Sequence, residues 1–165
     1  MSYAIAVLLP GDERIERFRA AKMPSPLPEP HITLVYPFSR FSGIQSHIRD
    51  VCGGTPPFTV TLGKVGFSEN GFYLYLLPES GRRQLIGLHE ALSSGPLEGH
   101  HNPEMPSYIP HLSIGIMQGE DARQQAAREA EGLRQTFRVE SVQLLTIEEG
   151  RCVQVQSFPL GAEDF

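Results

Sequence analysis

Cysteine is scarce in this chain of 165 residues, and long hydrophobic runs are missing. The only two cysteines, Cys52 and Cys152, cannot build a disulfide framework or a cysteine-rich zinc cluster, and free thiols are typical of a reducing compartment. The apolar run at 3–9 is too short to cross a bilayer, lacks a basic leader and is followed by Asp12 and Glu13. We therefore expect a cytoplasmic protein with no membrane partner.

An excess of positive charge is also lacking, since 14 Lys and Arg against 19 Asp and Glu leave a net charge of −5. Proteins that coat nucleic acids through their phosphates are usually basic, so we expect no extended nucleic-acid surface. A few local cations and backbone N–H groups can still hold a single phosphate. A small or end-bound phosphate ligand and a monomeric protein are the expectations that follow.

Strand-like and helix-like patterns alternate along the chain. Period-two or continuous apolar runs predict strands at 3–9, 31–36, 58–62, 65–68, 72–77, 111–117, 137–145 and 152–158. Helical spacing predicts helices beginning after an Asp12 N-cap and at 41–51, 80–92 and 120–135. Proline-rich loops are expected at 23–30 and 95–110, and Asn70–Gly71 is typical of a hairpin turn.

This order of elements repeats itself along the chain. His111 follows His31 by 80 positions, and Phe137 follows Phe58 by 79. A chain that repeats a supersecondary unit tends to pack its copies about a pseudo-twofold axis, near which equivalent residues meet. We predict an α+β fold of two pseudo-symmetric lobes, each an antiparallel sheet with outer helices, around a central cleft. Residues 1–165 would form one bilobal domain.

Two matching segments, PHITL and PHLSI, stand at corresponding points of this repeat and contain His31, Thr33, His111 and Ser113. Alternate residues of a strand share a face, so each histidine lies on the same side as the hydroxyl two positions later. The apolar residues between them are committed to the core. The histidine and hydroxyl faces are then left for water or a ligand.

Histidine and hydroxyl side chains in this pattern suit phosphodiester chemistry without a metal. Such chemistry needs a base for the attacking oxygen, an acid for the leaving oxygen and donors for the phosphoryl oxygens. An imidazole can do either proton transfer near neutral pH, so a pair can do both. Gly115, next to the second motif, is a point where a ligand could approach the backbone closely.

On these paired motifs the chain resembles the 2H phosphoesterase superfamily, especially its bacterial 2′-5′ RNA ligase-like branch. The resemblance implies a two-lobed α+β fold and an enzyme that needs no cofactor. It implies activity on 2′,3′-cyclic phosphates or on 2′-5′ linkages of nucleotides or RNA ends, which some members also join. By motif matching, His31 and His111 would be the acid/base pair, and Thr33 and Ser113 would bind the phosphate.

Several alternatives stand beside this interpretation. The chain could be a non-catalytic nucleotide- or RNA-end-binding module on the same fold. The motif histidines could be structural, with their polar atoms satisfied by the backbone. A metal site could form if His100 and His101 supplied further ligands, although their spacing to His111 is irregular; our prediction is no metal.

Residues near the motifs divide between substrate contact and ordinary packing. Phe38, Arg40 and Tyr108 are candidate substrate contacts, the aromatic rings because nucleobases stack on them. By strand parity Tyr36 falls on the core side, where packing is the favoured role. Two further histidines, His47 and His89, fall on predicted helices and are expected to be surface or boundary residues.

Overall fold

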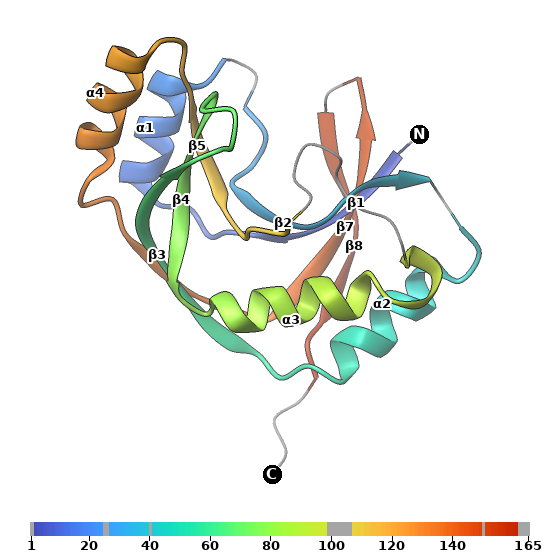
Figure 1. Ribbon diagram of the computed structural model, residues 1–165. Coiled ribbons are helices and arrows are strands. Elements are labelled where there is room, and N and C mark those ends of the chain that lie inside the picture. The colour runs from blue at the N-terminus through green and yellow to red at the C-terminus, as the bar shows by residue number, and fades with distance from the viewer. Residues whose placement is uncertain (1, 25–26, 40, 99–106, 150, 162–165) are drawn as a thin grey trace.

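Two antiparallel four-stranded sheets form the framework of the protein in a computed structural model (Figure 1). The structure describes residues 2–24, 27–39, 41–98, 107–149 and 151–161. The strand order is β2-β1-β7-β8 in the first sheet and β5-β4-β3-β6 in the second. The strands are β1 (Ser2–Leu8), β2 (His31–Ser39), β3 (Phe58–Phe67), β4 (Tyr73–Ser80), β5 (Leu112–Ile116), β6 (Gln135–Val139), β7 (Ser141–Glu148) and β8 (Arg151–Pro159). The predicted α+β class and its pair of sheets are confirmed.

The helices cover the sheets in a crossed arrangement. They are α1 (Glu13–Lys22), α2 (Ile44–Gly53), α3 (Arg82–Leu92) and α4 (Glu120–Ala130), with a single 3-10 turn at Gly95–Leu97. Helix α1 connects two strands of the first sheet but packs on β5 of the second, beside α4 (Figure 1). Helix α3 connects two strands of the second sheet but packs on β2 of the first. Each motif strand is therefore covered by a helix from the opposite half.

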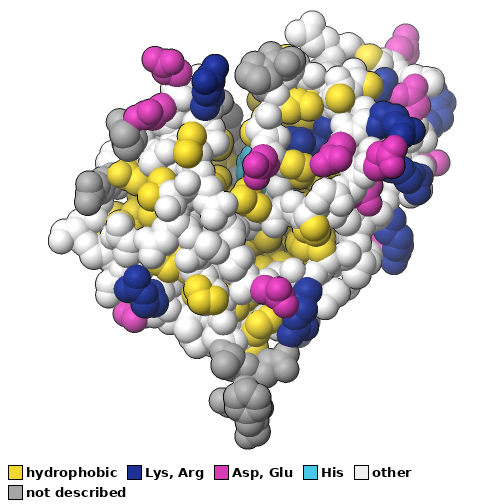
Figure 2. Space-filling model, turned by 180° about the vertical axis from the view of Figure 1, so that it is seen from behind, with side chains coloured by type: hydrophobic (Ala, Val, Ile, Leu, Met, Phe, Trp, Pro, Cys, Tyr) yellow, Lys and Arg dark blue, Asp and Glu magenta, His cyan; other side chains and the backbone are white. Residues whose placement is uncertain are grey.

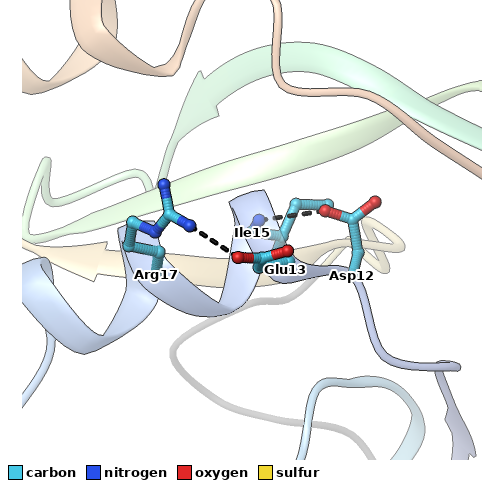
Figure 3. Close-up of polar contacts among 4 residues, drawn as sticks. All are labelled: Asp12, Glu13, Ile15 and Arg17. Atoms are coloured by element: carbon cyan, nitrogen blue, oxygen red, sulfur yellow. Dashed lines mark hydrogen bonds and ion pairs between the residues drawn. The ribbon is translucent and has the colours of Figure 1, made fainter.

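Helix α1 begins where the sequence predicts it. The side chain of Asp12 accepts a hydrogen bond of 3.1 Å from the backbone N–H of Ile15, the N-cap contact that satisfies a free helix donor (Figure 3). One turn on, Arg17 forms an exposed ion pair with Glu13 at 2.7 Å. The opposite face buries Ile15 and, four residues later, Arg19. The cap thus fixes the rotation that turns Arg19 inward.

Two boundaries differ from the prediction at the end of α4. The helix stops at Ala130 rather than 135, because Gly132 adopts a positive φ of 87° that turns the chain. The strand expected at 137–145 is divided between β6 and β7, which belong to different sheets. The chain changes sheets at Glu140, so one apolar alternating run supplies core residues to both sheets. Periodicity alone does not reveal such a crossing.

The hairpin between β3 and β4 matches the sequence signal. The backbone N–H of Gly71 donates to the carbonyl of Ser68 at 2.8 Å, and Gly71 has a φ of 74°. The Asn70 side chain accepts from Ser68 Oγ and from the N–H of Phe72. Strand β3 runs unbroken through the gap expected between 62 and 65.

Both motif strands contain a β-bulge at the same point of the repeat. In β2 the register against β1 passes from Thr33 to Val35, which leaves Leu34 as the extra residue. In β5 the register against β4 passes from Ser113 to Gly115, which leaves Ile114 as the extra residue. Leu34 and Ile114 are both fully buried and lie 80 positions apart, as the two histidines do. The internal repeat therefore extends to the irregularity of the strand.

Among the described residues, no helix is long and apolar enough to cross a bilayer.

Candidate active site

The two motifs lie on the edge strands of the two sheets, and these strands come close to each other. β2 ends the first sheet and β5 ends the second, and the two are in contact. His31 is the first residue of β2, and His111 directly precedes β5. The back view of the molecule shows a notch between two masses, with histidine surface inside it (Figure 2). The fold thus brings together segments that are 80 residues apart.

Each motif histidine is held by the same hydrogen bond. The Nδ1–H of His31 donates to the carbonyl of Glu29 at 2.8 Å, and the Nδ1–H of His111 donates to the carbonyl of Ile109 at 2.7 Å. A carbonyl only accepts, so the bond fixes the proton on Nδ1 and leaves Nε2 as the basic nitrogen of the neutral ring. Both rings are therefore oriented alike, two residues after their anchor.

The environment keeps both imidazoles neutral more readily than water would. Burial lowers the pKa of His31, the bond to Glu29 opposes this, and the positive charge of Arg19 lowers it further. Burial also lowers the pKa of His111, the bond to Ile109 opposes it, and a charge on His31 lowers it further. The edge strands of the two histidines contact each other, and the pKa of each ring is lowered mainly by burial.

The hydroxyl residues of the motifs are half-buried, as their histidines are. Their main chains are held by side chains from elsewhere in the fold. The Tyr108 hydroxyl donates to the carbonyl of Thr33 at 2.7 Å, and Arg19 Nε donates to the carbonyl of Ser113 at 3.1 Å. Their hydroxyl groups share the face of the histidines, because the bulges come only after them.

The bulges overturn the parity expectation for Tyr36. Two consecutive buried residues, Leu34 and Val35, return Tyr36 to the face of His31, and it is only half-buried. Burial raises the pKa of Tyr36, and the nearby Tyr75 raises it further. Tyr75 in turn stacks on the ring of His111, with centroids 3.8 Å apart. Tyr36 therefore belongs to the histidine site rather than to the core.

Other candidate contacts fall in different places. Phe38 is 6% exposed and packs its ring between those of Tyr3 and Phe41, so the packing interpretation accounts for it. Tyr108 uses its hydroxyl on the Thr33 carbonyl and stacks on His89 at 3.9 Å. Arg40, the third candidate, lies outside the described residues.

Gly115 serves helix packing instead of the close ligand approach that we expected. A Cβ added there would lie 2.7 Å from Met117 Cε and 3.2 Å from Lys22 Cβ. The missing side chain lets α1 sit tightly on β5.

Two supporting residues were missed by the sequence reasoning, Arg19 and His89. His89 is half-buried, which fits the boundary position that we expected, but its role was missed: its Nδ1–H donates to the carbonyl of Leu34 at 2.7 Å, at the bulge of β2. The signal was present in the helical spacing. Arg19 falls four residues after Ile15, and His89 falls four after Leu85, so both lie on buried faces.

A metal site needs several ligand side chains close together. Those residues contain no group of three or more His, Cys, Asp or Glu that could hold a metal ion. His100 and His101, which the metal alternative needed, lie outside the described residues.

Comparison with known proteins agrees with this geometry. The family model described as "2'-5' RNA ligase superfamily" matches residues 9–151. A curated protein of Geobacillus thermodenitrificans, named "Putative phosphoesterase", is 34% identical over 91 residues, which are 52% of this chain and 50% of that protein. The chain thus spans about half the length of the curated relatives it matches.

Solved structures share the fold over almost the whole chain. Escherichia coli LigT in complex with 3′-AMP is 20% identical, with a TM-score of 0.66 and coverage of 96% of this chain and 97% of that one. A Thermus thermophilus protein is 17% identical, with a TM-score of 0.70 and coverage of 99% and 100%. The expected two-lobed fold is therefore confirmed by neighbours as well as by topology.

Proposed function

We propose, from the premise that the chain belongs to the 2′-5′ RNA ligase superfamily, that it is a metal-independent phosphodiesterase. Its substrates would be 2′,3′-cyclic phosphates or 2′-5′-linked nucleotides and RNA ends. One observation carries the proposal: two imidazoles at matching points of a repeat are tethered by the same Nδ1 bond, on edge strands that contact each other. Two histidines fixed only for structure need not be anchored alike on strands that meet.

The reaction follows from the states of the two rings. One neutral imidazole takes the proton of an attacking water through Nε2, while the other, protonated, gives its proton to the leaving ribose oxygen. The new bond from oxygen to phosphorus forms as the bond to that ribose oxygen breaks. The hydroxyls of Thr33 and Ser113 donate to the non-bridging oxygens as charge moves onto them. Either histidine can fill either role.

The same groups can also join nucleotides. If the 5′-hydroxyl of a second nucleotide replaces water as the attacker on a 2′,3′-cyclic phosphate, its oxygen bonds to phosphorus, the bond to the 3′ oxygen breaks as the acid protonates it, and a 2′-5′ linkage forms. Cleavage of a 2′-5′ linkage to a cyclic phosphate is the reverse of this step, so by microscopic reversibility the two histidines exchange their roles. Ligation is therefore part of the proposal, and product analysis decides which direction dominates.

Nucleotide chemistry is favoured by the aromatic surroundings of the histidines. Tyr75 raises the pKa of the nearby Tyr36, and it stacks on His111. Structures of E. coli LigT hold 3′-AMP, NADP⁺ and ATP. The net charge of −5 favours a nucleotide or an RNA end over a long duplex. We also propose a monomer, and a cytoplasmic location suits the two free cysteines.

The test is a panel of 2′,3′-cyclic nucleotides and 2′-5′ dinucleotides with chromatographic product analysis. We expect ring opening or cleavage, and no loss of activity on treatment with EDTA. Loss of activity that zinc restores would favour the metal alternative. Binding of a cyclic nucleotide without product after long incubation would replace the enzyme with the binding-module alternative.

A further inference from the structure

One buried charge next to the histidine site has no role in the proton transfers above. Arg19 is 3% exposed on α1, and its charge influences His31. Burial lowers the pKa of Arg19 and the nearby Glu16 opposes this, but a guanidinium stays charged throughout the neutral range. Burying a charge is costly unless its donors are satisfied, so the contacts of Arg19 indicate its purpose.

Those contacts join the two motifs. Arg19 Nε donates to the carbonyl of Ser113 at 3.1 Å, inside the second motif. A terminal guanidinium nitrogen of the same side chain donates to the carbonyl of Pro28 at 3.1 Å, in the loop that leads into His31. One rigid planar group therefore links the strand of one histidine to the approach of the other.

We propose that Arg19 is a positioning residue that sets the spacing of the two histidine motifs, an inference that rests on the proposed function. It reaches no reacting atom by itself. Its fork fixes two carbonyls from opposite halves, those of Pro28 and Ser113. A small displacement of either motif would spoil proton transfer to a common phosphorus.

The neighbouring charged and helical groups do not make the same pair of contacts. The equivalent helix α3 uses His89 on the carbonyl of Leu34, which lies within one motif strand only. Lys22, one turn after Arg19, is engaged by Glu129 at 2.8 Å. Arg19 bonds both motif segments at once, and the Tyr108 hydroxyl, from the loop that leads into His111, adds a second link through its 2.7 Å bond to the carbonyl of Thr33.

The experiment compares Arg19→Lys with Arg19→Gln, because lysine keeps the charge and glutamine keeps a neutral donor. Neither keeps the fork. We expect kcat on the best substrate of the panel to fall about tenfold to a hundredfold in both variants, with a smaller change in KM. Arg17→Gln is the matched control on the same helix, because Arg17 is exposed and, among the residues the structure describes, pairs with Glu13 alone. It should retain wild-type kcat.

A second measurement does not depend on turnover. NMR titration of the histidine ring protons should show the His31 midpoint move to higher pH in Arg19→Gln and stay in place in Arg19→Lys and Arg17→Gln. A merely structural role would lower thermal stability without this charge-specific pattern. If the wild-type protein turns over nothing in the panel, the proposed function fails, whereas the titration still tests Arg19. Unchanged kcat together with an unmoved His31 midpoint would overturn the inference.

Discussion

The two motif strands share a bulge and a histidine anchor, but they differ in what stands behind each ring. In the second half Tyr75 pairs with Ser113 and stacks on His111, whereas the equivalent partner of Thr33 in the first half is Ala6. The first half instead receives the charge of Arg19 next to His31. The two halves are thus alike in the backbone that anchors each imidazole. They differ in the side chains next to the rings, Tyr75 at His111 and Arg19 at His31.

Removing either imidazole is the strongest test of whether the two halves contribute equally. His31→Asn and His111→Asn should each lower kcat/KM at least about a hundredfold, because each removes an acid/base group. The double variant should be little worse than either single one, since the pair acts as a unit. His47→Asn is the control, because His47 bonds only the Leu92 carbonyl among its recorded partners. Full activity in both single variants would sink the two-histidine proposal.

The motif hydroxyls offer the next largest effect. Thr33→Val and Ser113→Ala remove a donor to the phosphoryl oxygens but keep the strand and the carbonyls that Tyr108 and Arg19 hold. We expect kcat to fall about tenfold to a hundredfold in each. Steady-state kinetics on a cyclic nucleotide measures the loss. A change confined to KM would make these groups ground-state binders and contradict the assigned role.

The stacked ring behind His111 sharpens the difference between the halves. Tyr75→Leu removes the aromatic face, which is worth about 0.5–1.5 kcal/mol, so the rate should fall about twofold to tenfold. Tyr75→Phe keeps the stack and should keep the rate. The NMR titration of His111 should change in the leucine variant while that of His31 stays. Equal changes at both histidines would show that Tyr75 does not distinguish the halves.

The lowered pKa of both imidazoles sets the pH dependence. A reaction that needs one neutral and one protonated imidazole is fastest at a pH between the pKa values of the two rings. Since burial lowers the pKa of His31 and of His111, the maximum of kcat/KM should lie below about pH 6.5. A maximum clearly above pH 7 would contradict this environment. Bound phosphate favours the protonated rings, so the maximum of kcat should lie higher than that of kcat/KM.

The same shifts affect stability with a definite sign. In the folded protein the pKa values of His31 and His111 lie below the value of about 6.5 for an unfolded histidine. In the pH range between these values the unfolded chain binds more protons, so the free energy of unfolding falls as the pH is lowered. Urea unfolding from pH 7.5 to pH 5 measures the slope. His31→Asn should flatten it, and an unchanged slope in that variant would remove His31 as its source.

The smallest effect concerns how the two halves unfold. We propose that residues 1–165 behave as one bilobal domain, because α1 and α3 each pack on the sheet of the opposite half. Circular dichroism and tyrosine fluorescence should then report the same single thermal transition. Two separate transitions would mean that the halves are independent domains.

Much of the site was predictable from spacing, because period-two alternation and an 80-residue repeat are properties of the chain itself. The motifs, the Asp12 cap and the hairpin at Asn70–Gly71 are of this kind. The placement of Tyr36 was not, since a bulge reverses parity and leaves no mark in residue type. The crossing at Glu140 and the reach of Arg19 depend on tertiary packing, which periodicity does not encode.

The crossed helices also have a mechanical consequence. A helix that is covalently attached to one sheet and packed on the other acts as a brace, and this molecule has one in each direction, α1 on β5 and α3 on β2. Hinged opening of the notch would have to strip both braces from their strands at once. The crossed packing therefore resists a change in the separation of the two histidine segments.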